Sequence, residues 1–167
     1  MTTRTWTLER NSKYGGIQRL GERAPLPKGA VVSITHGKGL SLWQTILNSM
    51  YSGWFILPQL PKNENLLYAE LHGDFKSGES LTITVWRGKA MTQFRDNGGH
   101  GWAIKLLTNL VFGGNATLWF LTYTPNDGQI PSADEARRLS EQHGKMMKHG
   151  KFIRSATRPA KNAPLVE

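Results

Sequence analysis

The feature that most constrains the fold is an alternating run near the middle of the chain, residues 81–86, with the sequence LTITVW. Successive side chains of a β-strand point to opposite faces, so this alternation predicts a strand with two different faces. One face carries Leu81, Ile83 and Val85, and the other carries Thr82, Thr84 and Trp86. The segment therefore predicts one strand of a sheet, with a tryptophan on its mixed face.

A short helical run, residues 91–96, follows this strand, and Gly98 and Gly99 interrupt the helix just before His100. Glycine adopts backbone angles that other residues resist, so the chain can turn sharply and direct His100 from the start of a second helix. This arrangement brings Trp86 and a titratable imidazole within reach of one cavity. The spacing suggests a small-molecule site.

Periodicity and turn residues predict four main strands and three helices, with one further short strand around residues 5–8. Apolar, β-branched or alternating runs predict strands at residues 30–35, 66–75, 80–86 and 116–123. Helical spacing, capping residues and terminating Gly or Pro predict helices at residues 40–55, 89–111 and 132–143. The order β-α-β-β-α-β with an added helix is that of the ferredoxin-like arrangement, an α+β fold with an antiparallel sheet and two helices on one face.

The helix expected over residues 40–55 carries its large apolar side chains at spacings of three and four. These side chains are Trp43, Ile46, Leu47, Met50 and Trp54. Such a stripe is typical of a helix face buried against the core, and we favour that interpretation over a cofactor-lining role.

The two strands at residues 66–75 and 80–86 are expected to divide their side chains between a helix-covered face and an open face. The covered face is expected to carry Leu67, Ala69, Leu71, Leu81, Ile83 and Val85, and the open face Tyr68, Glu70, His72, Thr82, Thr84 and Trp86. An aromatic mixed face of that size is rarely left in water. We therefore expect two copies of the chain to pair these faces as a homodimer, which would close a barrel around a cavity.

Charge divides the chain into a basic N-terminal arm at residues 1–29, a central domain at residues 30–144 and a basic C-terminal tail at residues 145–167. The formal net charge is +9; the arm has six Lys and Arg against two Glu, the tail has six against one, and the centre is balanced. Basic ends can contact nucleic acid or an anionic membrane weakly and without specificity. Solvated, mobile termini are the favoured interpretation.

Composition excludes several classes of site. The chain contains no cysteine, so disulfides, thiolate catalysis and Cys-based metal sites are excluded. The five histidines do not fall at zinc-ligand spacings, and we expect no metal site. No apolar run is long enough for a transmembrane helix, and the first residues lack the apolar stretch of a secretory signal, so we expect a cytoplasmic protein.

The central motif resembles the dimeric α+β barrel superfamily. The resemblance rests on residues 81–86 and on Ala90, Met91, Phe94, Arg95, Gly99, His100 and Ala103. Within that superfamily the chain is similar to the branch of antibiotic-biosynthesis monooxygenases and relatives of spheroidene monooxygenase, and the similarity covers residues 30–125. The superfamily includes cofactor-independent oxygenases, haem enzymes, isomerases and dehydratases, so the resemblance implies the fold more directly than the reaction.

His100 is the leading candidate catalytic residue, because an imidazole can act as a general base or bind a metal near neutral pH. As a base it would remove a proton from an activated phenol or quinol and leave an electron-rich carbanion that reacts with oxygen, the route that the resemblance to cofactor-free oxygenases implies. As a haem ligand it would bind iron through one ring nitrogen, so haem stays open as a cofactor. The alternative is that His100 only caps or packs the start of its helix.

Further candidates lie on the predicted strands and beside the broken helix. Glu70 and His72 share one strand face and could act as a catalytic acid–base pair, or lie solvated at the rim of the sheet. Trp86 could form the wall of the catalytic cavity, or simply pack in a dimer interface. The candidates for substrate binding are Tyr68, Thr84, Arg95 and His36.

These features lead us to expect a small monooxygenase-like enzyme that acts on a hydrophobic aromatic or polyene compound inside a barrel cavity. Two alternatives remain open. One is a non-catalytic barrel that binds haem or an apolar ligand. The other is an interaction protein that docks through its basic arms.

Overall fold

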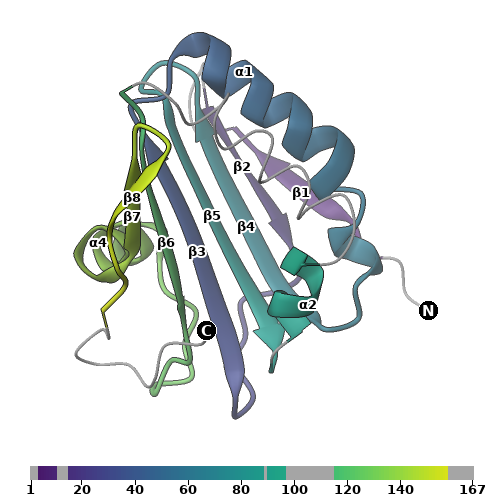
Figure 1. The fold of residues 1–167 in the computed structure, drawn as a ribbon. Helices are drawn as coiled ribbons and strands as arrows, with labels where there is room; N and C mark the ends of the chain where they lie inside the picture. Colours follow the sequence, from purple (N-terminus) through teal and green to yellow (C-terminus); the bar gives the residue numbers. More distant parts are fainter. Residues whose placement is uncertain (1–3, 11–14, 89, 97–114, 158–167) are drawn as a thin grey trace.

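The computed structural model describes residues 4–10, 15–88, 90–96 and 115–157, and it shows an α+β fold built on one eight-stranded antiparallel sheet (Figure 1). In chain order the strands are β1 (Trp6–Glu9), β2 (Gly15–Leu20), β3 (Ala30–Lys38), β4 (Leu66–Asp74), β5 (Glu79–Arg87), β6 (Thr117–Tyr123), β7 (Lys145–Lys148) and β8 (Lys151–Arg154). The helices are α1 (Leu42–Tyr51), α2 (Ala90–Asp96) and α4 (Ala133–His143), with a π-helical turn η1 (Ser52–Ile56) and a 3₁₀ turn η2 (Leu60–Lys62). None of these described helices is long and apolar enough to cross a membrane.

The strands lie in the order β1-β2-β4-β5-β3-β6-β7-β8, so the sheet is open, with β1 and β8 at its two edges. The four strands expected from the sequence form its centre, as β3, β4, β5 and β6. The helix α4 is also confirmed: the hydroxyl of Ser132 accepts a hydrogen bond from the backbone N–H of Glu135 at 3.2 Å, and the helix ends before Gly144. The strands β2, β7 and β8 were not expected.

Helices cover both faces of the sheet. The helices α1 and α2 lie on one face and α4 lies on the other (Figure 1). Between the sheet and α4 a core is formed by buried residues that include Val32, Ile34, Tyr68, Leu81, Ile83, Val85, Leu121, Tyr123, Ala136 and Leu139. The expectation of an open sheet face was therefore wrong, because Ala136 and Leu139 of α4 cover that face. The sheet formed by the described residues does not close into a barrel.

The register of β4 against β5 corrects the expected division of side chains. Asp74 pairs with Glu79 across a turn of four residues, which places Glu70 opposite Ile83 and Leu71 opposite Thr82. Residues directly opposite each other point to the same face of a sheet. The four-residue turn therefore puts the even-numbered residues of β4 on the same face as the odd-numbered residues of β5, which is the reverse of the expected division. Tyr68, Glu70 and His72 consequently lie with Leu81, Ile83 and Val85 on the α4 side. A bulge between Leu66 and Tyr68 then returns Leu66 to the face of Trp86.

Gly78 fixes that turn. Its backbone φ is +63°, and an added Cβ would overlap the backbone of Leu40. The carbonyl of Gly78 also accepts a hydrogen bond from the Leu40 N–H at 3.0 Å. The turn between β4 and β5 is thereby joined to the segment that leads into α1.

The helix α1 is oriented opposite to expectation. Its N-terminus is closed by a capping box between Ser41 and Gln44. Of its residues Thr45 is buried, whereas the side chains of Trp43 and Met50 are 64% and 42% exposed. Trp54, in the following π-helical turn, is 67% exposed. Three residues of the expected stripe, Trp43, Met50 and Trp54, are thus turned outward, whereas Ile46 and Leu47 are half-buried.

Candidate functional site

The strand β4 positions three of the expected site residues in a row on the α4 side of the sheet. Tyr68, Glu70 and His72 are two residues apart, so their side chains share one face. Glu70 is 2% exposed. Its Oε1 lies 2.5 Å from Nε2 of His72, and its Oε2 accepts a hydrogen bond from the hydroxyl of Tyr68. The two residues that the sequence suggested as an acid–base pair are therefore in contact, and the carboxylate of the pair is buried.

Two arginines complete the surroundings of Glu70. Arg19 lies opposite Glu70 in the β2–β4 register, and its Nε is 3.4 Å from Oε2. Arg23 approaches the same oxygen with Nη2 at 3.2 Å and also donates hydrogen bonds to the carbonyls of Ile130 and Pro131, at 3.2 and 3.0 Å. Arg23 therefore links Glu70 to the segment that precedes α4. Neither arginine was expected, because β2 was not.

The charges in this cluster are set by burial and hydrogen bonding. Burial favours the neutral acid of Glu70, but hydrogen bonds from His72 and Tyr68 and the charge of Arg23 outweigh it, so the pKa of Glu70 falls well below its ordinary value. Burial, together with the hydrogen bond to Glu70, raises the pKa of Tyr68. At neutral pH the cluster therefore holds a carboxylate and a neutral phenol.

This arrangement prepares His72 for proton transfer. The contact between Nε2 and an ionised carboxylate places a proton on Nε2 and orients the ring. Nδ1 is then the acceptor nitrogen, and no residue in the described ranges provides a hydrogen bond to it. The side chain is about 10% exposed, so the ring is largely enclosed but still reaches solvent. Such a histidine can act as a general base, with Glu70 as its positioning residue.

His36 forms a second polar cluster on the same sheet face, beneath α4. The ring is fully buried and stacks on Trp119, with ring centroids 5.0 Å apart. Nδ1 lies 3.2 Å from Oγ of Ser140, and Nε2 lies 3.3 Å from Oε1 of Glu79. Burial lowers the pKa of His36, although Glu79 and Glu141 act in the opposite direction. His36 therefore joins β3 to α4 as a neutral side chain closed off from solvent.

Trp86 and Thr84 lie on the opposite face, so the structure does not bring them together with Glu70 and His72. Trp86 is 1% exposed and packs with Leu66 and Met91, and its ring centroid is 5.0 Å from that of Phe94. Thr84 donates a hydrogen bond to the carbonyl of Ser33 at 3.5 Å. Both residues have packing roles here.

The remaining expected site residues cannot be placed. His100 lies outside the described residues, and of Arg95 only the backbone, within α2, is described. No group of three or more His, Asp or Glu side chains in the described ranges is arranged to hold a metal ion.

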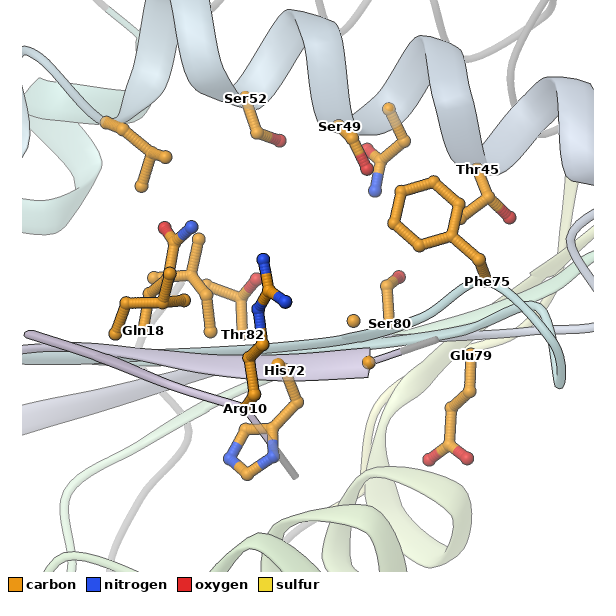
Figure 2. A pocket seen from close by; sticks show the side chains of 17 residues that line it. Arg10, Gln18, Thr45, Ser49, Ser52, His72, Phe75, Glu79, Ser80 and Thr82 are labelled. Atoms are coloured by element: carbon orange, nitrogen blue, oxygen red, sulfur yellow. The ribbon is translucent and has the colours of Figure 1, made fainter. Parts of the chain in front are cut away.

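A cavity of about 510 Å³ separates α1 from the sheet. Figure 2 shows that Thr45 and Ser49 of α1 and Ser52 of η1 face Gln18 and Thr82 of the sheet across this space. Further lining residues are Arg10, Asn48, Leu57, Leu71, Phe75 and Ser80. The side chains of His72 and Glu79 point away from the cavity, toward α4 (Figure 2). The cavity and the Glu70 cluster are thus separated by the thickness of the sheet.

Haem, which the resemblance leaves open, is not accommodated by the described lining. Haem iron requires an axial side chain that projects into its pocket. Within the described ranges His72 is the one histidine at the cavity wall, and its ring points away from the cavity (Figure 2). The ring is also bound to Glu70.

Comparison of the chain with protein-family models, with curated proteins and with solved structures found no match in any of the three.

Proposed function

We propose that this protein is a small monooxygenase-like enzyme in which His72 serves as the general base and Glu70 positions it. The observation that carries the proposal is the 2.5 Å contact between Nε2 of His72 and the buried, ionised carboxylate of Glu70. The order β4-β5-β3-β6 of the central strands, with α1 and α2 on one face, supports a ferredoxin-like core. Sheet-to-sheet dimerisation is not part of the proposal, because α4 covers that face.

The proposed substrate is a hydrophobic aromatic compound with an acidic phenol or quinol hydroxyl. His72 would accept the hydroxyl proton at Nδ1, and Glu70 would stabilise the resulting imidazolium through Nε2. Deprotonation leaves an electron-rich carbanion whose ring carbon forms a C–O bond with O2. Loss of water from the resulting hydroperoxide leaves a quinone, so the substrate itself supplies the two electrons that reduce the second oxygen atom. Arg23 and Arg19 keep the Glu70 carboxylate ionised and in place through its Oε2. The other oxygen, Oε1, is thereby held against Nε2 of His72.

Oxygen uptake with a panel of naphthoquinols and phenols tests the proposal. His72→Gln should lower turnover by about 100-fold or more, because it removes the proton acceptor. Glu70→Gln should lower turnover less and change its pH profile, since it acts through His72. His149→Asn is the matched control, because His149 is an exposed histidine with a φ of 50°, a conformation that Asn tolerates. Full activity of His72→Gln with a substrate that the wild type oxidises would refute the assignment.

The cavity beneath α1 favours a second candidate function, that of a non-catalytic ligand-binding protein. Its wall carries hydroxyl and amide side chains and one cation, Arg10, and no titratable His, Asp or Glu side chain among the described residues points into it. Leu8, Leu57, Leu71 and Phe75 also line the cavity. This mixture of apolar and hydrogen-bonding side chains suits the binding of a small amphipathic molecule more than acid–base chemistry. If Thr82→Val weakens binding of a ligand that His72→Gln leaves unaffected, this second function is favoured.

A further inference from the structure

The outer face of α1 and η1 carries the largest group of exposed apolar side chains on one described segment. This group, the α1 patch, consists of Leu42, Trp43, Met50, Trp54 and Phe55, whose exposed fractions are 63, 64, 42, 67 and 50%. The helix lies at the outside of the fold, with its polar side toward the sheet (Figures 1 and 2). Large apolar side chains exposed together on one segment are typical of an interaction site.

The sequence around the α1 patch is free of charge. Residues 39–61 contain no Asp, Glu, Lys, Arg or His, and Lys38 and Lys62 flank them on either side. Trp43 and Trp54 are eleven residues apart, which separates them by roughly 16 Å along the helix axis. Tryptophan and phenylalanine side chains settle in the headgroup region of a bilayer, so a helix that carries them near both ends can lie along that region.

The net charge of the chain favours a bilayer over a second copy of the chain as the binding partner of the α1 patch. Each copy carries a formal charge of +9, so pairing two copies through their α1 patches would bring like charges together. An anionic lipid surface instead attracts the same charge while the apolar side chains enter the acyl boundary. A protein partner of ordinary composition would also be expected to meet a charged rim, which residues 39–61 do not provide.

We propose that the α1 patch docks the protein onto an anionic lipid bilayer, with α1 and η1 lying in the plane of the interface. The Trp43 and Trp54 rings then anchor the two ends of the helix, and the exposed Lys62 faces the phosphate layer. Lys38 takes no part, because it pairs with Glu141 of α4 on the other face of the sheet. The polar side of α1 remains above the cavity, so docking and the cavity use opposite sides of one helix. The Glu70 cluster is on the other face of the sheet, and the proposal does not depend on its chemistry.

Vesicle co-sedimentation of the full chain tests this inference. The vesicles are phosphatidylcholine with about 30% phosphatidylserine, compared with phosphatidylcholine alone, at roughly 0.15 M salt. The wild type should bind the anionic vesicles, and Trp43→Gln/Trp54→Gln should lower the partition coefficient about tenfold or more. Trp43→Phe/Trp54→Phe should retain most of the binding, because phenylalanine keeps the apolar contact. The comparison of the two double variants therefore distinguishes a loss of apolar contact from a loss of the fold.

A matched control comes from β8, where Phe152 and Ile153 are each 56% exposed. Phe152→Gln/Ile153→Gln removes two exposed apolar side chains of similar exposure from a distant surface, and vesicle binding should be unchanged. Equal loss in this control and in Trp43→Gln/Trp54→Gln would overturn the inference, as would no binding by the wild type. A lipid-free dimer that Trp43→Gln/Trp54→Gln dissociates, without vesicle binding, would assign the patch to a second copy. Trp43 and Trp54 already shielded from acrylamide in the lipid-free protein would also overturn it.

Discussion

Glu70→Gln should destabilise the protein more than any exposed carboxylate substitution, because Glu70 accepts several hydrogen bonds in a buried position. Removing one partner of a fully buried charge pair costs about 3–5 kcal/mol. Arg19 and Arg23 are 34% and 40% exposed, however, and water can solvate them when the carboxylate is gone. The remaining loss is the charged hydrogen bonding of His72 and Tyr68, so we expect about 2–3 kcal/mol.

The same substitution has a defined pH dependence. The folded-state pKa of Glu70 lies below its ordinary value of 4.5, so the carboxylate stabilises the fold fully above about pH 4.5. That contribution is lost as pH falls toward the folded-state pKa, because the unfolded chain binds the proton first. The difference in unfolding free energy between wild type and Glu70→Gln should therefore be largest at pH 7 and shrink below about pH 4.5.

Urea unfolding followed by circular dichroism at several pH values measures this difference. Glu9→Gln is the matched control: Glu9 contacts the same Arg19 at 2.5 Å, but its side chain is 61% exposed. We expect it to cost about 0.5 kcal/mol or less. Equal costs for the two substitutions, or a Glu70→Gln cost that does not change between pH 7 and pH 3, would refute the burial argument.

Three further outcomes follow from the fold. Because burial lowers the pKa of His36, wild-type stability should decline as pH falls below the ordinary histidine value of 6.5, and His36→Gln should flatten that decline in thermal unfolding curves. Gly78→Ala should lower the unfolding free energy by roughly 2 kcal/mol or more, because φ is +63° and Leu40 occupies the Cβ position. Gly73→Ala, with open space around it, should be near neutral in the same urea titration. Light scattering without lipid should give the 18.7 kDa mass of one chain, since α4 covers the sheet face expected to dimerise; a doubled mass would contradict this.

Local patterns predicted the central elements because each of these carries its own signal. The alternation of residues 81–86 and the capping residue Ser132 are local features, and β5 and α4 formed where they indicate. The strand β2 has two glycines in six residues, and β7 begins and ends with lysine, so neither has the composition of a typical strand. Both segments form strands because neighbouring strands of the sheet pair with them. The sequence of each segment alone carries no information about that pairing.

The orientation of side chains was harder to predict than the elements. The face on which Glu70 lies depends on whether the turn before β5 has an even or odd number of residues, a difference of one position. The pairing of Glu70 with His72 follows from their spacing and was expected. The roles of Arg19 and Arg23 depend on the unexpected strand β2 and on long-range packing. The outward stripe of α1 was misjudged because periodicity identifies an apolar face but not the surface that it meets.

The edge strand β8 also bears on the resistance of this protein to aggregation. Within the described residues β8 pairs on one side alone, with β7, so its other side offers unpaired backbone donors and acceptors to a passing chain. Phe152 and Ile153 would make such strand addition favourable. Lys151 and Arg154 bracket them, and Lys145 lies 3.9 Å from the Phe152 ring. This crowding of positive charge acts as a gatekeeper, so neutralising it would convert the edge into a template for aggregation.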